Sequence, residues 1–304
     1  MISRLTKAVN VFGFIVKHPL TKNQKSRALL RYCVWQIISR SLRRDFLLRF
    51  VSDTKLLVRH GDHSAAGNFY VGLLSFEEMS FVLHYLRKGE LFVDVGANIG
   101  AFTVLASGVC RSRTIAFEPS PKNFKKLAAN IRVNDIQDLV QSYMTIVDNV
   151  NGVGHFVSDS GSVIDHVLEP GEESINVIEV PSITLDEVLD REQPKMIKID
   201  VEGVETRILD GAERTLGKQS LDVLIVELKG HGKRYGFDER LVIKKLEEYG
   251  FVPIVYDPFT RSVRKIVDPW LNGRSVTEIF CRNPDLVEDR LAKGNVFQVL
   301  GHYI

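Results

Sequence analysis

Acidic residues recur at the ends of apolar runs in this sequence, where the carboxylates of a sheet protein can do chemistry. They are Asp94, Glu118, Asp148, Asp200, Glu202 and Glu227. If those runs are strands of an open parallel sheet, their carboxyl ends meet at the edge where such sheets bind ligands. Half-buried carboxylates must be paired or hydrogen-bonded to stay charged. Suitable partners are ribose hydroxyls, an adenine amino group, a substrate hydroxyl or a metal ion.

The first two of these acids belong to a nucleoside-binding pattern. An apolar run over residues 91–95 leads into Gly96-Ala97-Asn98-Ile99-Gly100, and a second run over 114–117 ends in Glu118. This order predicts a strand, a tight turn, a helix and a second strand. We expect Gly96 and Gly100 to admit the close approach of a ligand. We expect Glu118 to accept hydrogen bonds from two ribose hydroxyls.

The spacing of the glycines indicates which kind of nucleoside ligand is bound. Gly-x-Asn-x-Gly departs from Gly-x-Gly-x-x-Gly, the pattern that holds the pyrophosphate of NAD and FAD. It fits a ligand that has no pyrophosphate, such as S-adenosylmethionine (SAM). The alternative interpretation is a turn glycine before a purely structural helix.

The elements that must position these residues alternate between strands and helices. A helix begins after Ser75, and later helices show apolar residues three and four positions apart. The predicted strands cover residues 91–95, 114–117, 140–147, 196–199, 223–226, 251–256 and 276–280. This rhythm predicts an α/β fold with an open, mostly parallel sheet and helices on both faces. Over residues 150–182, short segments of alternating apolar and polar residues, separated by glycines, interrupt this rhythm and predict an inserted β-hairpin.

Charge sets the first fifty residues apart. They hold eleven Lys or Arg and one acidic residue, a net charge of +10, whereas the other 254 residues carry 29 basic and 37 acidic ones, a net charge of −8. The basic and apolar residues have the spacing of one or two amphipathic helices. Such a helix either packs on the core or makes peripheral contact with the inner membrane surface or another anionic partner. Nucleic acid is not expected, because no aromatic-interleaved sheet accompanies the charge.

Length and composition fit one large α/β domain with an appendage. The chain has 304 residues, of which 44% are hydrophobic and 26% charged. Its three cysteines are far apart and show neither a disulfide framework nor a zinc-binding spacing, which favours a reducing, cytoplasmic location. No apolar run is long enough for a transmembrane helix, and no signal peptide is convincing. The oligomeric state is not indicated.

The expected organisation has three parts. Residues 1–75 form a basic helical extension and a short β segment, with short strands and turns over 51–75. Residues 76–285 form the main domain, which includes the 150–182 insertion. Residues 286–304 form a C-terminal tail.

Three ordered motifs resemble those of the FkbM family of SAM-dependent methyltransferases. They are Phe92-Val93-Asp94-Val95-Gly96-Ala97-Asn98-Ile99-Gly100, Phe117-Glu118-Pro119, and Ile197-Lys198-Ile199-Asp200-Val201-Glu202-Gly203-Val204-Glu205 with Leu209-Asp210-Gly211-Ala212. The resemblance covers about residues 85–285 and leaves out the first fifty. It implies a class I methyltransferase (Rossmann-like) fold, with a seven-stranded sheet whose last strand is antiparallel. It also implies methyl transfer to a hydroxyl oxygen, often on a sugar, glycan or natural product.

The same resemblance implies a set of cofactor-binding residues. Asp94 and the turn residues Gly96, Ala97, Asn98 and Gly100 lie at the methionine end of SAM. At the nucleoside, Glu118 with Pro119 binds the ribose and Asp148 binds the adenine amino group.

Methyl transfer to a neutral alcohol needs orientation and benefits from a general base within hydrogen-bond reach. Asp200 is the first choice for the base, because it ends the strand next to the SAM-binding strand. Glu202, Glu227 and His231 are the second choices. The structural alternative is helix capping by Asp200 with dipole support from Glu202 and Glu205.

Two further alternatives stay open at this stage. A divalent metal held by Asp200, Glu202 and Glu227 is chemically reasonable, since hard cations prefer oxygen ligands, but it is not expected. A non-catalytic or membrane-recruited binding module on the same fold would explain the basic N-terminal segment.

Overall fold

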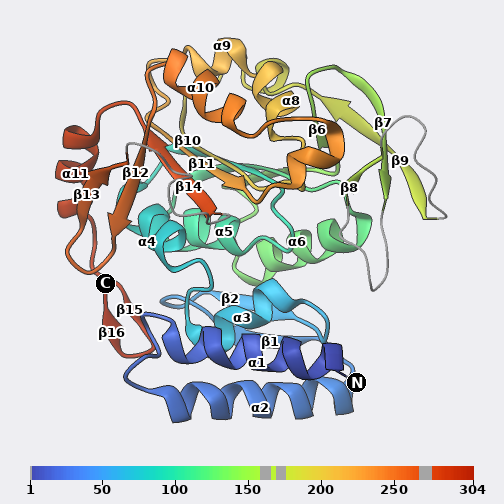
Figure 1. Ribbon diagram of the computed structural model, residues 1–304, viewed down its shortest axis with the longest axis vertical. Coiled ribbons are helices and arrows are strands. Elements are labelled where there is room, and N and C mark those ends of the chain that lie inside the picture. Colours follow the sequence, from blue (N-terminus) through green and yellow to red (C-terminus); the bar gives the residue numbers. More distant parts are fainter. Residues whose placement is uncertain (1, 158–165, 169–175, 267–275) are drawn as a thin grey trace.

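The computed structural model describes residues 2–157, 166–168, 176–266 and 276–304 (Figure 1). Within them, the largest sheet has eight strands in the order β13-β12-β14-β11-β10-β3-β4-β5. The strands are β3 (Leu91–Val95), β4 (Arg113–Phe117), β5 (Val140–Tyr143), β10 (Pro194–Ile199), β11 (Val223–Leu228), β12 (Val252–Asp257), β13 (Ser262–Lys265) and β14 (Val276–Cys281).

The neighbours from β5 to β11 pair in parallel, and β14 is antiparallel to both β11 and β12. The predicted class I methyltransferase sheet, mostly parallel with one antiparallel strand, is therefore confirmed. The edge strand β13 is an eighth strand in the described chain that the sequence pattern did not predict.

Alternation along the strands divides their side chains between two buried layers. Val93 and Val95 of β3 pack in a cluster with helices α7 (Leu185–Val188), α8 (Glu205–Asp210), α9 (Glu213–Leu216) and α10 (Arg240–Glu248). Phe92 faces the other layer, with α4 (Phe76–Tyr85) and α11 (Pro284–Ala292). Figure 1 shows α8, α9 and α10 above the sheet and α4, α5 and α6 below it. Helices thus cover both faces, as the alternation of strands and helices in the sequence predicts.

The helix that follows β3 differs in detail from the prediction. It begins as α5 (Ala101–Thr103) and continues as a π-helix over Val104–Val109, where the sequence predicts a single helix over 100–109. Helix α6 (Pro121–Val133) starts after Ser120 with proline in its first turn, as predicted.

The insertion after β5 is larger than the predicted hairpin. In the described residues, β6 (Ile146–Val147), β7 (Gly152–Val157), β8 (His166–Val167) and β9 (Val177–Ile183) form a second sheet in the order β6-β9-β7-β8. The single strand predicted over 140–147 is two strands, because β5 joins the main sheet and β6 joins this one. Parts of the predicted insertion, residues 158–165 and 169–175, lie outside the described residues.

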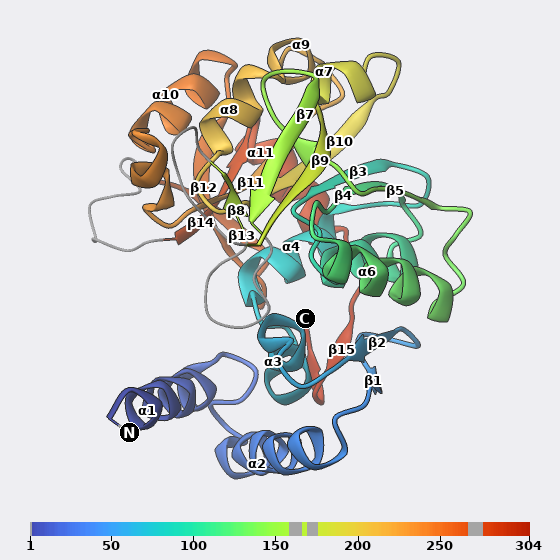
Figure 2. The ribbon, with the colours of Figure 1, turned by 90° about the vertical axis from the view of Figure 1, so that its right-hand side faces the viewer.

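The N-terminal segment forms a layer below the main domain (Figure 2). It consists of α1 (Ile2–Lys17), α2 (Lys25–Leu42), the antiparallel pair β1 (Phe46–Arg49) and β2 (Lys55–Val58), and α3 (His63–Val71). None of the described helices combines the length and apolarity needed to cross a membrane.

The expectation of short strands and turns over 51–75 holds for β2 but is wrong for α3, which is helical. Gly67, which the sequence pattern indicated as a turn residue, lies inside helix α3. A Cβ added there would come within 2.5 Å of the Leu74 side chain, so the glycine serves close packing. At the other end of the chain, the predicted tail contributes to α11 and forms a small hairpin of β15 (Gln298–Val299) and β16 (His302–Tyr303).

The junction of α8 and α9 generates a prediction about stability. A Cβ added to Gly211 would lie 2.3 Å from the backbone oxygen of Asp148, an atom that cannot rotate away. We expect Gly211→Ala to lower the free energy of unfolding by about 1–3 kcal/mol. Gly217→Ala is the control, because the nearest atom to its added Cβ is 3.4 Å away. Urea unfolding of the two variants would contradict this packing account if both kept wild-type stability.

Candidate active site

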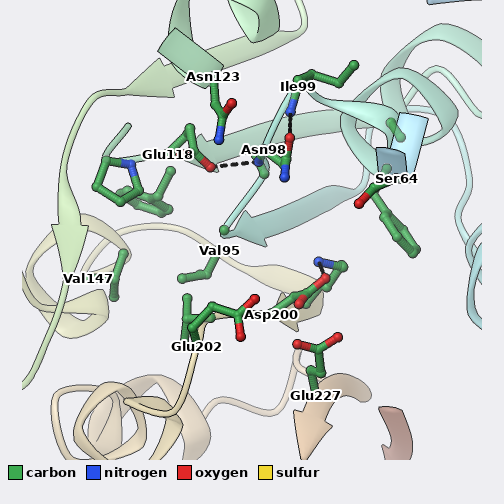
Figure 3. Close-up of a pocket in the computed structure, with 18 of the residues that line it drawn as sticks. Ser64, Val95, Asn98, Ile99, Glu118, Asn123, Val147, Asp200, Glu202 and Glu227 are labelled. Atoms are coloured by element: carbon green, nitrogen blue, oxygen red, sulfur yellow. Dashed lines mark hydrogen bonds and ion pairs between the residues drawn. The ribbon is translucent and has the colours of Figure 1, made fainter. Parts of the chain in front are cut away.

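A cavity of about 450 Å³ opens at the carboxyl ends of β3, β4, β10 and β11 (Figure 3). The turn after β3 and the loop after β10 line this cavity. Ser64, Ala65 and Asn68 of α3 line it on one side, and Phe156 and His166 of the inserted sheet line it elsewhere. The cavity therefore combines the predicted sheet edge with two segments outside the sequence motifs.

The turn between β3 and α5 is held by the neighbouring strand. The backbone N–H groups of Gly96 and Ala97 both donate to the Phe117 carbonyl, at 3.0 and 2.9 Å. Gly96 has a φ of +76°, and a Cβ there would lie 2.0 Å from the backbone oxygen of Asp200. Gly100 has a φ of +89°, and its Cβ would meet Leu127 of α6 at 2.5 Å. Both glycines thus admit close approach by the protein's own atoms, and their approach to a ligand stays a prediction.

Glu118 is fixed at the wall of this cavity by backbone donors. The Asn98 N–H donates to its Oε2 at 2.8 Å, and the Ser120 N–H donates to its Oε1 at 3.0 Å. Asn98 adopts a φ of +52°, and its own Oδ1 accepts from the Ile99 N–H at 2.8 Å. These two bonds orient the Glu118 carboxylate, which lines the cavity.

A buried lysine lies beneath the other end of the cavity. Lys198 Nζ is 2.8 Å from Asp200 Oδ2 and 4.0 Å from Asp94 Oδ1. Burial disfavours the charged form of Lys198, but the two carboxylates outweigh it and raise the pKa of Lys198. Burial alone would raise the pKa of Asp200, but the charge of Lys198 and a hydrogen bond with Glu227 outweigh it and lower the pKa to about 2. Asp200 is therefore ionised at neutral pH.

Glu227 lies beside Asp200 and is nearly buried, at 6% exposure. Burial, followed by the negative charge of Asp200, raises the pKa of Glu227 to about 8, although Lys229 is ion-paired with it. Two neighbouring carboxyl groups with separated pKa values are typical of functional sites. At neutral pH this pair holds one proton, on Glu227.

Glu202 and His231 form a second polar pair near the cavity. Glu202 lines the cavity, and its Oε2 is 2.6 Å from His231 Nδ1. The first helix after this loop, α8, has Val204 as its N-cap residue. The structural alternative of helix capping by Asp200 is therefore wrong, because the aspartate precedes the cap by four positions.

Several predicted site residues lie behind the cavity wall rather than on it. Asp94, Gly100, Asp148 and His231 are described residues that do not line the cavity. Asp94 is fully buried; Thr103 Oγ1 donates to its Oδ2 at 2.7 Å, and burial raises the pKa of Asp94. Asp148 accepts from Nε of Arg207 at 2.7 Å and also from its Nη2. The remaining predicted cofactor and catalytic residues, Gly96, Ala97, Asn98, Glu118, Pro119, Asp200, Glu202 and Glu227, do line it.

The sequence analysis missed some residues that line the cavity. Lys198 carried a signal, because it is the lone charge in the apolar run Met196–Ile199, but no role was assigned to it. Ser64 and Asn68 gave no signal, since the segment that carries them was not recognised as a helix. Among the described residues, no group of three or more His, Cys, Asp or Glu is arranged to hold a metal ion.

Comparison with known proteins identifies the class of protein. The model of the methyltransferase FkbM domain matches residues 94–253, which is more than half of the chain. The fold and the match together define a class I methyltransferase. The chain belongs to the FkbM methyltransferase family, and its membership implies SAM as the cofactor.

One curated relative is the hexuronic acid methyltransferase AglP of Haloferax volcanii, with 28% identity over 178 residues. The alignment covers 55% of this chain and 65% of the relative, less than two thirds of that protein.

Two solved structures illustrate the structural likeness. SMU.1697c of Streptococcus mutans, in complex with S-adenosylhomocysteine, has 12% identity and a TM-score of 0.38 over 67% of this chain and 93% of that one. A precorrin-6y C5,15-methyltransferase of Geobacter metallireducens has 14% identity and a TM-score of 0.37 over 68% and 86%.

The raised pKa of Glu227 predicts a pH dependence of stability. A carboxyl group with a pKa of about 8 when folded and 4.5 as its ordinary value binds its proton more tightly in the folded state. The contribution of Glu227 to the free energy of unfolding is fully present below the pKa of the unfolded state and is lost as the pH rises through about 8. The free energy of unfolding of the wild type should therefore fall relative to that of Glu227→Gln as the pH rises.

Urea titrations of both proteins from acidic to mildly alkaline pH measure this difference. A difference that stayed constant across the range would show that Glu227 does not hold its proton in the folded protein.

Proposed function

We propose that this protein transfers the methyl group of SAM to an oxygen atom of a sugar acceptor. The observation that carries the proposal is one cavity with Glu118 at one end and the Asp200–Glu227 pair at the other. Membership of the FkbM family supports the donor. The hexuronic acid methyltransferase from Haloferax volcanii supports a sugar as the acceptor.

The residues around the first turn fit the donor. Glu118 offers oriented carboxylate oxygens to a ribose diol, and its bond to the Asn98 N–H fixes the turn against it. Gly96, Ala97 and Asn98 line the cavity next to Asp200, which suits the methionine end. When bound there, SAM supplies an electrophilic methyl group on a sulfonium.

Asp200 is suited to orient an acceptor hydroxyl. Its side chain is 36% exposed and ionised, and Lys198 holds one of its oxygens at 2.8 Å. A carboxylate with a pKa near 2 is a good hydrogen-bond acceptor but a weak base. Positioning of the hydroxyl should therefore contribute more to the rate than proton abstraction.

The cations at this end of the cavity favour an acidic sugar. Lys229 lines the cavity, its side chain is 44% exposed and its ammonium pairs with Glu227, so a positive charge lies at this end for an acceptor carboxylate. A hexuronic acid presents both hydroxyl and carboxylate oxygens. Since a carboxylate is already deprotonated, methylation there would need no base, and the importance of Asp200 separates the two outcomes.

The donor assignment predicts the effect of Glu118→Ala. Loss of the hydrogen bonds from the ribose to a charged acceptor should weaken SAM binding by about tenfold to a hundredfold. Glu187→Ala, at an exposed position of α7, is the matched control and should bind as the wild type does. Isothermal titration calorimetry measures both. Equal affinity of Glu118→Ala and wild type would remove the ribose assignment.

The acceptor assignment predicts that Asp200→Asn keeps SAM affinity and loses turnover, by about a hundredfold or more if a hydroxyl is methylated. Single-turnover assays with a hexuronic acid acceptor and labelled SAM measure it. Alkaline hydrolysis of the product distinguishes an ester, which is cleaved, from a stable ether. Full turnover with an ether product would exclude the proposed role of Asp200.

A further inference from the structure

Helix α2 presents an apolar stripe to solvent. Its packed side carries the buried residues Ala28, Trp35 and Ser39. Its outer side carries apolar residues at positions i, i+4, i+7, i+8 and i+12, a spacing that places them on one helical face. They are Leu30, Val34, Ile37, Ile38 and Leu42, with exposed fractions between 37% and 67%.

The position of α2 leaves this stripe uncovered by the described chain. Both ribbon views place α2 at the lower edge of the molecule, far from the main sheet (Figures 1 and 2). On its packed side, the ring of Tyr32 contacts the ring of Tyr70 in α3, and Arg31 donates to the Tyr70 carbonyl at 3.0 Å. These contacts fix the rotation of α2, so the stripe faces outward.

Basic residues gather at both ends of the stripe. Lys25 and Arg27 lie exposed at its start, and Arg40, Arg43 and Arg44 lie exposed at its end. Neither α1 nor α2 contains an acidic residue. Among the described residues, no ion pair joins any of these five side chains to an acid, so their charge is available to a partner.

We propose that this face of α2 docks on an anionic lipid bilayer, with the helix lying in the plane of the interface. An apolar stripe along one helix, with Lys and Arg at its ends, is a feature of interfacial helices. The residues after position 50 carry a net charge of −8, so an anionic surface attracts this end of the molecule and repels the rest. The charge distribution therefore also sets the orientation.

A second copy of this chain fits the face less well than a bilayer does. A symmetric dimer contact would bring together two copies of the N-terminal segment, each with a net charge of +10. Repulsion of this kind disfavours a dimer through α2, whereas anionic headgroups neutralise the same charges.

Sedimentation of the full chain with vesicles tests the proposal. We expect binding to vesicles of equal parts phosphatidylcholine and phosphatidylglycerol, little binding to phosphatidylcholine alone, and weakening by salt. Leu30→Ser with Ile37→Ser should lower partitioning about tenfold or more, because the apolar contribution is lost. Arg27→Ala with Arg40→Ala should lower it about twenty-five-fold, at about fivefold per charge.

Matched variants elsewhere on the surface are the controls. Leu241→Ser with Leu286→Ser, and Lys244→Ala with Lys293→Ala, change exposed residues of α10, α11 and the turn after α11 and should leave partitioning unchanged. Circular dichroism confirms that each variant is folded. Absence of wild-type binding to anionic vesicles, or equal loss in the controls, would overturn the proposal. So would light scattering that shows an α2-dependent dimer in a protein that ignores vesicles.

The test is independent of the methyltransferase chemistry. Vesicle binding needs neither SAM nor an acceptor, and none of the substituted residues lines the cavity in the described chain. Failure of docking would leave the proposed function standing, and failure of methyl transfer would leave docking standing.

Discussion

The buried charge of Lys198 is the constraint on which the site depends. Lys198 of β10 and Asp94 of β3 are register partners on adjacent parallel strands, and both side chains are buried. Thr103 donates to Asp94, and the Phe102 ring lies 4.8 Å from Lys198 Nζ. An ammonium so enclosed is tolerated only with carboxylate partners, which Asp94 and Asp200 supply. The position of Asp200 in the cavity therefore follows from charge pairing inside the sheet.

The same two strands lock the turn after β3 to the loop after β10. The Asp200 N–H donates to the Val95 carbonyl at 3.0 Å, and the Asp200 carbonyl occupies the space that a side chain at position 96 would need. A glycine at 96 is thus required by the protein's own backbone. Because the turn that bears Asn98 and the loop that bears Asp200 touch directly, neither can shift without moving the other.

The sequence predicted most of what depends on local pattern and little of what depends on distant pairing. The strand periodicity placed Glu118 and Asp200 correctly at the carboxyl edge of one sheet. Asp148 also follows an apolar run, but Arg207, 59 residues later in the chain, pairs with it, and no local signal marks that contact. Helix α3 was missed because its small residues and Gly67 were interpreted as turns, whereas Gly67 lies inside the helix close to the Leu74 side chain.

One part of the cavity wall is built outside the family match. That match covers residues 94–253, whereas α3 lies before it, and α3 contributes Ser64 and Asn68 to the cavity wall. Asn68 is held in place because its Oδ1 accepts from the Leu74 N–H at 2.7 Å. The opposite face of α3 contacts α2 through Tyr70 and Tyr32. One short helix thus connects the basic, apolar-striped surface to the cavity, because its two faces carry the contact with α2 and the cavity-lining residues.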